Sequence, residues 1–164
     1  MVTVAIVSDT HVPSRASRIP TWVRQEMAAA DHVVHAGDFD SKRAIETVER
    51  HAEHLTAVRG NVDPGRLDFP TVDTLTVEGV EFVVTHGDGS MHDYRERVIR
   101  TVRREANDPA SAVGVSGHTH EVHDEVVGEI HLLNPGSATA ASPAPAETML
   151  VADVEGGDLD VTHR

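Results

Sequence analysis

The 164-residue sequence contains no cysteine. This absence excludes disulfide bonds, zinc sites built from thiolates and catalysis by a cysteine nucleophile. No run approaches the roughly 20 consecutive apolar residues that a membrane-spanning helix requires, so we expect no membrane partner. The amino-terminal stretch has a brief apolar run with no basic segment before it, which predicts that it is not a signal peptide and that the protein is cytoplasmic.

Lysine is also nearly absent, since Lys42 is the only one. The chain has 27 acidic residues against 14 basic ones, for a formal net charge of -13 at pH 7. The acidic residues are scattered rather than collected in a disordered tail. One interpretation is an ordinary acidic enzyme. The favoured interpretation is a halophilic protein, because salt screens the repulsion within a carboxylate-rich surface and because low lysine with arginine retained resembles proteins of salt-loving archaea.

The chain length suits one domain spanning residues 1–164. In the first half, apolar runs alternate with amphipathic segments, and Ser41 is the expected N-cap of the second helix. The expected strands cover residues 2–7, 32–38 and 55–61, and the expected helices cover residues 21–30 and 41–54. This alternation predicts parallel strands joined by crossover helices.

The second half has a different rhythm. A turn at Glu78 and Gly79 predicts an antiparallel hairpin within residues 71–87. Residues 91–108 predict a third helix, and residues 134–147 form a loop by composition. Short strands are expected at residues 110–117, 121–127, 130–133 and 148–154. The predicted fold class is α/β, with two packed mixed sheets flanked by helices.

Polar residues directly follow five of the apolar strands. The stretches are SDTH, HAGDFD, RGNVD, THGD and SGHTH, and each strand ends in aspartate, histidine or asparagine. Each stretch alone is a common turn or cap, but the five together in this order are not expected by chance. Because ligands of open α/β sheets collect at the carboxyl ends of strands, we expect the five tips to converge.

These stretches supply seven nitrogen or oxygen donors and no sulfur. Seven donors are too many for one four-coordinate ion, but they suit two ions that share a carboxylate. Donors at i and i+2 of an extended chain lie about 6.6 Å apart on one face, which permits a metal pair about 3.5–4 Å apart as well as a single chelated ion. The seven candidate metal ligands are Asp9, His11, Asp38, Asn61, His86, His118 and His120.

The same ordered motifs, followed by NPGS at residues 134–137, resemble the calcineurin-like metallophosphoesterase superfamily and its small single-domain bacterial and archaeal phosphodiesterases. The resemblance covers essentially the whole chain and implies a four-layer α/β/β/α sandwich with a dinuclear metal centre. By motif, one ion would be held by Asp9, His11, Asp38 and His120, and the other by Asp38, Asn61, His86 and His118.

The implied activity is hydrolysis of a small phosphate ester, most simply a phosphodiester, by a hydroxide that bridges the two ions and is held by Asp38. Manganese is the expected metal, although iron, cobalt, nickel and zinc suit the same donors. A surface with little positive charge argues against nucleic acid as a partner other than as a phosphodiester substrate. The oligomeric state stays open between a monomer and a homo-oligomer.

Three positions near the motifs bear on catalysis. Many superfamily members carry a histidine after the motif asparagine, where this sequence has Val62, which cannot donate a proton. Asp63 is a candidate auxiliary acid, with a turn residue as the alternative. Arg59 is a candidate contact to the substrate phosphate, with a structural ion pair as the alternative.

Two further functions stay open at this point. One is a non-catalytic scaffold, because a retromer subunit shares the fold, although a scaffold can lose ligands and all seven positions are intact here. The other is a phosphomonoesterase, which would share the site and differ in the pocket.

Overall fold

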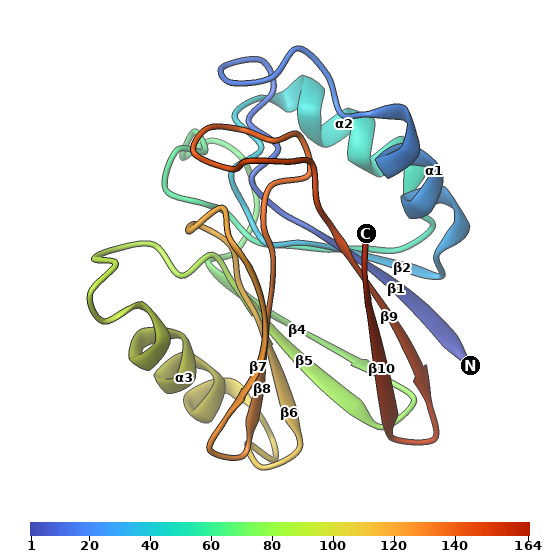
Figure 1. The fold of residues 1–164 in the computed structure, drawn as a ribbon, viewed down its shortest axis with the longest axis vertical. Helices are drawn as coiled ribbons and strands as arrows, with labels where there is room; N and C mark the ends of the chain where they lie inside the picture. Colours follow the sequence, from blue (N-terminus) through green and yellow to red (C-terminus); the bar gives the residue numbers. More distant parts are fainter.

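The computed structural model describes all 164 residues and consists of two five-stranded sheets packed face to face between helices (Figure 1). Two helices cover the outer face of the first sheet, and one helix covers the outer face of the second. The helices are α1 (Thr21–Ala29), α2 (Lys42–His51) and α3 (Tyr94–Glu105). The predicted four-layer α/β/β/α arrangement is confirmed.

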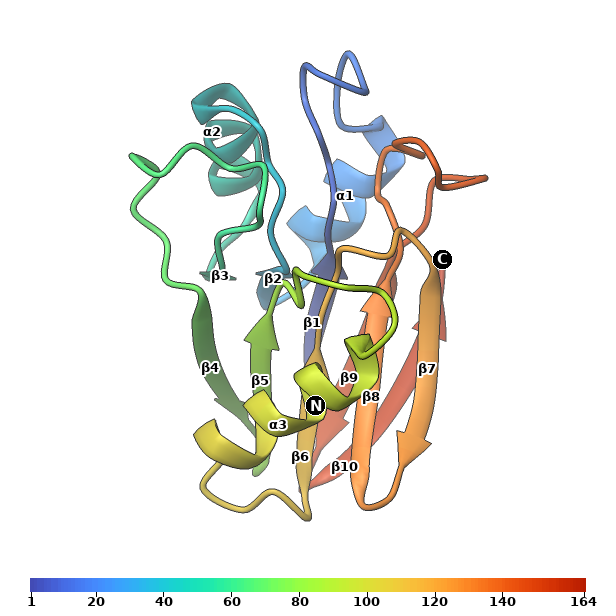
Figure 2. The same cartoon turned by 90° about the vertical axis from the view of Figure 1, so that its left-hand side faces the viewer.

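The first sheet has the strand order β10-β9-β1-β2-β3, in which β1, β2 and β3 are parallel and β9 and β10 are antiparallel to their neighbours. The second sheet has the order β4-β5-β6-β8-β7, with parallel pairs at its centre and an antiparallel pair at each edge (Figure 2). The strands are β1 (Val2–Val7), β2 (His32–His35), β3 (Leu55–Ala57), β4 (Val72–Val77), β5 (Val80–Thr85), β6 (Ala112–Val115), β7 (Val122–Val127), β8 (Ile130–Pro135), β9 (Leu150–Glu155) and β10 (Asp158–His163).

Three apolar layers hold the sandwich together. One lies between the first sheet and helices α1 and α2, a second between the two sheets, and a third between the second sheet and α3. Residues 4–7 of β1 are all fully buried, because one side of this strand faces the helices and the other faces the second sheet. This double burial explains why β1 reads as a continuous apolar run rather than an alternating one.

Local sequence signals account for several element boundaries. Ser41 caps α2 by accepting a hydrogen bond from the amide of Ala44 at 3.2 Å, as the sequence predicted. Glu78 and Gly79 both have positive φ angles, of 48° and 87°, in the tight turn between β4 and β5. None of the three helices is long and apolar enough to cross a membrane.

One element was not predicted. Strand β10 forms an antiparallel hairpin with β9 after a turn at Gly156 and Gly157, which have φ angles of 58° and 93°. Only one side of this edge strand is partly buried, and Leu159 and Val161 are its only apolar residues that pack against the core. Two apolar positions flanked by aspartates are too weak a pattern to identify a strand by alternation alone.

Candidate metal centre

The loops after β1, β2, β3, β5 and β6 meet at the carboxyl edges of the two sheets, at the upper ends of these strands in Figure 2. Main-chain hydrogen bonds tie them together: Asp9 N donates to Gly37 O at 3.0 Å, and Gly117 N donates to His86 O at 3.1 Å. The second of these bonds joins two loops of the second sheet, and the first joins two loops of the first sheet. The amide of His118 donates to Asp9 Oδ2 at 3.1 Å and joins the loops of the two sheets, so the convergence expected at the carboxyl ends of the strands is present.

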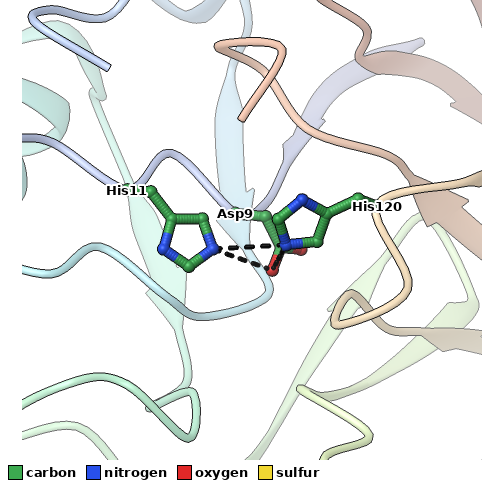
Figure 3. Close-up of side chains that lie close together, drawn as sticks. All are labelled: Asp9, His11 and His120. Atoms are coloured by element: carbon green, nitrogen blue, oxygen red, sulfur yellow. Dashed lines mark hydrogen bonds and ion pairs between the residues drawn. The ribbon is translucent and has the colours of Figure 1, made fainter. Parts of the chain in front are cut away.

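Asp9, His11 and His120 form a first buried group of donors (Figure 3). Asp9 Oδ1 lies 3.2 Å from His120 Nε2 and 3.6 Å from His11 Nε2. The two imidazole Nε2 atoms lie 3.3 Å from each other. Three ligand atoms thus face one point, although they come from two loops separated by more than 100 residues of sequence.

Asp38, Asn61, His86 and His118 form a second group next to the first. His86 Nε2 lies 3.1 Å from Asp38 Oδ2 and 3.0 Å from Asn61 Oδ1. His118 Nδ1 lies 3.1 Å from the same asparagine oxygen, while His118 Nε2 lies 3.2 Å from the Gly89 carbonyl oxygen and donates to it. Asn61 is exposed and His118 is half-buried, so this group opens toward solvent.

The two groups share carboxylate atoms. Asp38 Oδ2 lies 3.1 Å from His86 Nε2 and 3.6 Å from His11 Nε2, so one oxygen faces a histidine of each group. Asp9 Oδ1 is also within 4.0 Å of His86 Nε2. All seven predicted donors are therefore brought together, with Asp38 between the two groups.

The second ring nitrogen of three histidines is held by an oxygen acceptor. Nδ1 of His86 donates to the Ala36 carbonyl at 2.7 Å, and Nδ1 of His120 donates to the Ala141 carbonyl at 2.8 Å. Nδ1 of His11 lies 2.9 Å from Asp40 Oδ1. With the hydrogen on Nδ1, the Nε2 lone pair of each neutral ring points into the site, which is the orientation of a metal-ligating histidine.

The charges of the site call for a cation. Asp9 Oδ1 is buried without a hydrogen-bond partner, amid imidazole nitrogens that present lone pairs. Burial alone would lower the pKa of His86, but the carboxylates of Asp38 and Asp9 raise it to about 9. Burial alone would raise the pKa of Asp9, but the nearby His11 and His120 rings hold it well below its usual range. The donor set therefore fits divalent metal ions, which supply positive charge without occupying the Nε2 lone pairs with protons.

Most of the donor residues adopt a left-handed backbone conformation, which non-glycine residues rarely adopt. Such positions are strained and cluster at functional sites. The sequence contains no signal for this feature beyond the glycines next to the donors. The five donors with positive φ are Asp9 (52°), His11 (43°), Asp38 (62°), His118 (71°) and His120 (60°).

Two of the neighbouring glycines permit a close approach of the loops. A Cβ atom at Gly60 would collide with Asp38 Oδ1, and one at Gly117 would collide with Ser8 Oγ and with Asp9 Oδ2. The glycines of RGN and SGH therefore make room for the two carboxylates rather than only allowing the chain to turn.

Sequence reasoning missed several residues that position the donors. Asp40 orients His11, and Ser8 Oγ donates to Asp9 Oδ2 at 2.6 Å. Both residues lie within one or two positions of a predicted ligand, and this proximity was the only available signal. Metal-site histidines regularly need such a carboxylate on the far ring nitrogen.

The NPGS stretch, to which the sequence assigned no chemistry, supports the SGHTH loop. Asn134 Nδ2 lies within hydrogen-bond distance of the Gly117 carbonyl (2.9 Å), Thr119 Oγ1 (3.0 Å) and Tyr94 Oη (3.0 Å). Ser137 Oγ donates to the main-chain oxygen of Asp9 at 2.8 Å. These contacts fix the backbone around both histidines and the first carboxylate.

Asp63 accepts four main-chain hydrogen bonds. Its donors are the amides of Asp38, Phe39, Asp40 and Gly60, at 2.7–2.9 Å. Both carboxylate oxygens are occupied by amides, so the contacts favour a positioning role over that of a proton donor. Of the two roles that the sequence left open for Asp63, a turn residue agrees better with these contacts than an auxiliary acid does. Its side chain joins the loops after β2 and β3.

Three other residues near the motifs have distinct surroundings. Val62 is 41% exposed, and its amide donates to Asp38 Oδ1 at 3.0 Å. The main-chain amide of Arg59 donates to Pro70 O at 2.8 Å, and the guanidinium forms no ion pair with the donor carboxylates within 4.0 Å. His35 is fully buried, stacked on Phe39 with ring centroids 3.6 Å apart, as expected of a core histidine.

Comparisons with known proteins agree with this description. A model of the calcineurin-like phosphoesterase superfamily domain matches residues 2–157. The chain is 30% identical over 152 residues to a probable metallophosphoesterase of Methanocaldococcus jannaschii, covering 93% of this chain and 76% of that protein.

Two solved structures are also similar. Vps29 from Chaetomium thermophilum superposes with a TM-score of 0.84 at 16% identity, covering 100% of this chain and 96% of that one. Wild-type Vps29 from Entamoeba histolytica, complexed with zinc, superposes with a TM-score of 0.80 at 22% identity, covering 99% and 97% of the two chains. At these identities the likeness shows the fold.

Fold and donors together define an α/β sandwich with a candidate metal centre at the shared carboxyl edge of its sheets. The match over residues 2–157 and the archaeal relative then identify the family: the chain belongs to the calcineurin-like phosphoesterase superfamily. The resemblance stated from the motifs is confirmed.

Proposed function

We propose that the protein is a metal-dependent phosphodiesterase that binds two divalent ions. The observation that carries this proposal is the convergence of all seven donors into two adjoining groups, with Asp38 Oδ2 facing a histidine of each. The first ion would be held by Asp9, His11, Asp38 and His120. The second would be held by Asp38, Asn61, His86 and His118.

When bound, such ions neutralise phosphate charge and lower the pKa of a coordinated water, so that hydroxide is present near neutral pH. The protein's own residues provide the geometry. Asp38 and Asp9 supply the carboxylates between the groups, and Asp40 fixes the His11 ring. Asp63 accepts hydrogen bonds from four amides and so fixes the position of the Asp38 loop.

The leaving group has no evident proton donor. Val62 occupies the position at which many superfamily members have a histidine, and Asp63 has no free oxygen. We therefore propose aryl and other stable leaving groups as the best substrates, because general acid catalysis contributes about 10²–10⁴-fold where it operates. Arg59 stays a proposed contact to substrate.

The metal is proposed to be manganese, with zinc as the first alternative because a Vps29 structure of this fold contains zinc. Nitrogen and oxygen donors without sulfur suit both. We further propose that the enzyme acts in the cytoplasm of a cell with a high salt content, in keeping with the net charge of -13.

A scaffold function is the competing proposal, since Vps29, named for vacuolar protein sorting, superposes over the whole chain and one Vps29 structure contains a bound cyclic peptide. Hydrolysis of bis(4-nitrophenyl) phosphate and of 4-nitrophenyl phosphate by manganese-loaded protein decides between diesterase, monoesterase and scaffold. The variant Asp38→Asn should abolish turnover, whereas the control Asp158→Asn, on the exposed edge strand β10, should not. Absence of turnover with every metal would favour the scaffold.

A further inference from the structure

The loop between β1 and α1 lines two hollows beside the donors, and Arg15 belongs to both. One hollow, of about 310 Å³, is also lined by His11, Asp40 and Val62. The other, of about 370 Å³, is also lined by Arg18 and by none of the candidate donors. Arg15 therefore stands between the proposed site of phosphate binding and a second, larger space.

The backbone of Arg15 is bonded to His11, and its side chain is bonded to a neighbouring loop. Its main-chain amide donates to the carbonyl of His11 at 2.9 Å. Its Nη1 donates to the Ser142 carbonyl at 2.9 Å, which ties it to the loop between β8 and β9 (blue and orange-red loops, Figure 2). A guanidinium has five N–H donors, so this contact leaves several for a ligand.

The second hollow has the charge to receive an anion. Arg15 and Arg18 contribute two of the 14 basic residues of a chain with net charge -13. The one carboxylate that lines it, Glu147, accepts a hydrogen bond from Trp22 Nε1 at 2.7 Å. A guanidinium group can form bidentate hydrogen bonds with two phosphate oxygens. The rest of the protein surface is acidic and repels anions.

We propose that Arg15 and Arg18 form a second anion subsite, which selects phosphodiesters that carry a further phosphate group beyond the scissile one. The inference rests on the proposed phosphodiesterase function and names its substrate class. A diester with a single phosphate fills only the hollow beside His11, whereas one with an added terminal phosphate also reaches the hollow beside Arg18.

The test compares the 5′-phosphorylated thymidine dinucleotide with the same dinucleotide lacking the terminal phosphate, at 0.15 M salt. The wild-type kcat/KM should be about fivefold higher for the phosphorylated substrate, which is the upper end of the contribution of one exposed ion pair. Arg15→Gln and Arg18→Gln should each remove most of this preference through KM. The control Arg103→Gln, which removes an equal charge on α3, should retain it.

A binding measurement keeps this inference separate from the proposed function. Calorimetric titration with thymidine 3′,5′-bisphosphate and with thymidine 5′-monophosphate should show tighter binding of the bisphosphate, and the preference should be lost in the two arginine variants. Equal affinities in the wild type, or equal losses in the Arg103 control, overturn the subsite. Failure of the wild type to cleave bis(4-nitrophenyl) phosphate overturns the enzymatic function instead, whatever the binding result.

Discussion

The main-chain amide of Val62 donates a hydrogen bond to Asp38 Oδ1 at 3.0 Å. The residue that stands in place of a proton-donating histidine is thus attached to the carboxylate proposed to serve both ions. Because the contact uses the backbone, the side chain at position 62 can change without breaking it. Val62 also lines the hollow that contains His11, so a longer polar side chain there would face the substrate.

The first prediction follows from that attachment. Val62→His should raise kcat/KM for alkyl phosphodiesters by about tenfold, which is below the range of about 10²–10⁴ for a well-placed general acid because the new side chain would be imperfectly placed. It should change the rates of aryl diesters little. Steady-state rates over a series of leaving-group pKa values check this, with Val126→His on β7 as the control. If the wild type cleaves aryl and alkyl diesters equally fast, another acid already acts.

The second prediction concerns metal content. Wild-type protein loaded with manganese should contain two ions per chain, as measured by inductively coupled plasma mass spectrometry. Asp38→Ala should lower the content of both, because its Oδ2 faces His11 and His86 alike. Asp158→Ala is the matched control. A single ion in the wild type, or an unchanged content in Asp38→Ala, contradicts the shared-carboxylate arrangement.

The third prediction tests Asp40, which sequence reasoning overlooked. Asp40→Ala should weaken metal affinity about 10–100-fold, as is typical when the partner of a ligating histidine is removed, because the His11 ring loses the acceptor that orients it. Competition with a chelator measures the affinity, and Asp160→Ala on the exposed strand β10 serves as the control. Unchanged affinity would mean that packing alone orients His11.

The fourth prediction concerns acid stability. His35 Nδ1 accepts the Gly37 amide, and burial lowers the pKa of the ring to about 3, whereas an unfolded histidine titrates near 6.5. Between these values the unfolded chain binds one more proton, so stability falls as the pH drops below about 6.5, by about 1.4 kcal/mol per pH unit. The free energy of unfolding of the metal-free protein, measured with urea at several pH values, should fall less steeply with decreasing pH in His35→Gln than in the wild type. If the unfolding free energies of the wild type and the variant fall equally with pH, other groups cause the acid sensitivity.

The fifth prediction concerns salt. With a net charge of -13, carboxylate repulsion should destabilise the fold at low ionic strength and be screened as the Debye length falls from about 10 Å at 0.1 M to about 3 Å at 1 M. The melting temperature should therefore rise with potassium chloride over this range. A flat or falling melting temperature would remove the halophilic interpretation and leave the enzymatic one intact.

The sequence predicted that the candidate donors would lie close together, because each one directly follows an apolar strand and parallel strands bring their carboxyl ends to one edge. His11 and His120 are 109 positions apart and follow strands of different sheets, and their shared ion was implied by the family resemblance rather than by the strand pattern. The positioning residues were harder to predict. Asn134 and Ser137 act through contacts with Gly117 and Asp9, across 17 and 128 positions, and a single sequence carries no signal for such pairings.

Asp63 shows a different limit. Its position after RGNV suggested a substitute acid, since composition reveals that a carboxylate is present but not which atoms it faces. Only the folded loops show that four amides surround it. Strand β10 was missed for a related reason, because an edge strand with one partly buried side has little apolar pattern to detect.

The left-handed donors have a consequence for how this protein would respond to selection. Each such residue costs roughly 1–2 kcal/mol relative to an unstrained one, and glycine relieves the cost. Replacing the half-buried His118 with glycine should therefore raise the melting temperature of the metal-free protein even as the site loses a ligand. Selection for thermal stability alone would therefore replace these ligand residues early, and a homologue that no longer needs catalysis would become more stable by losing them.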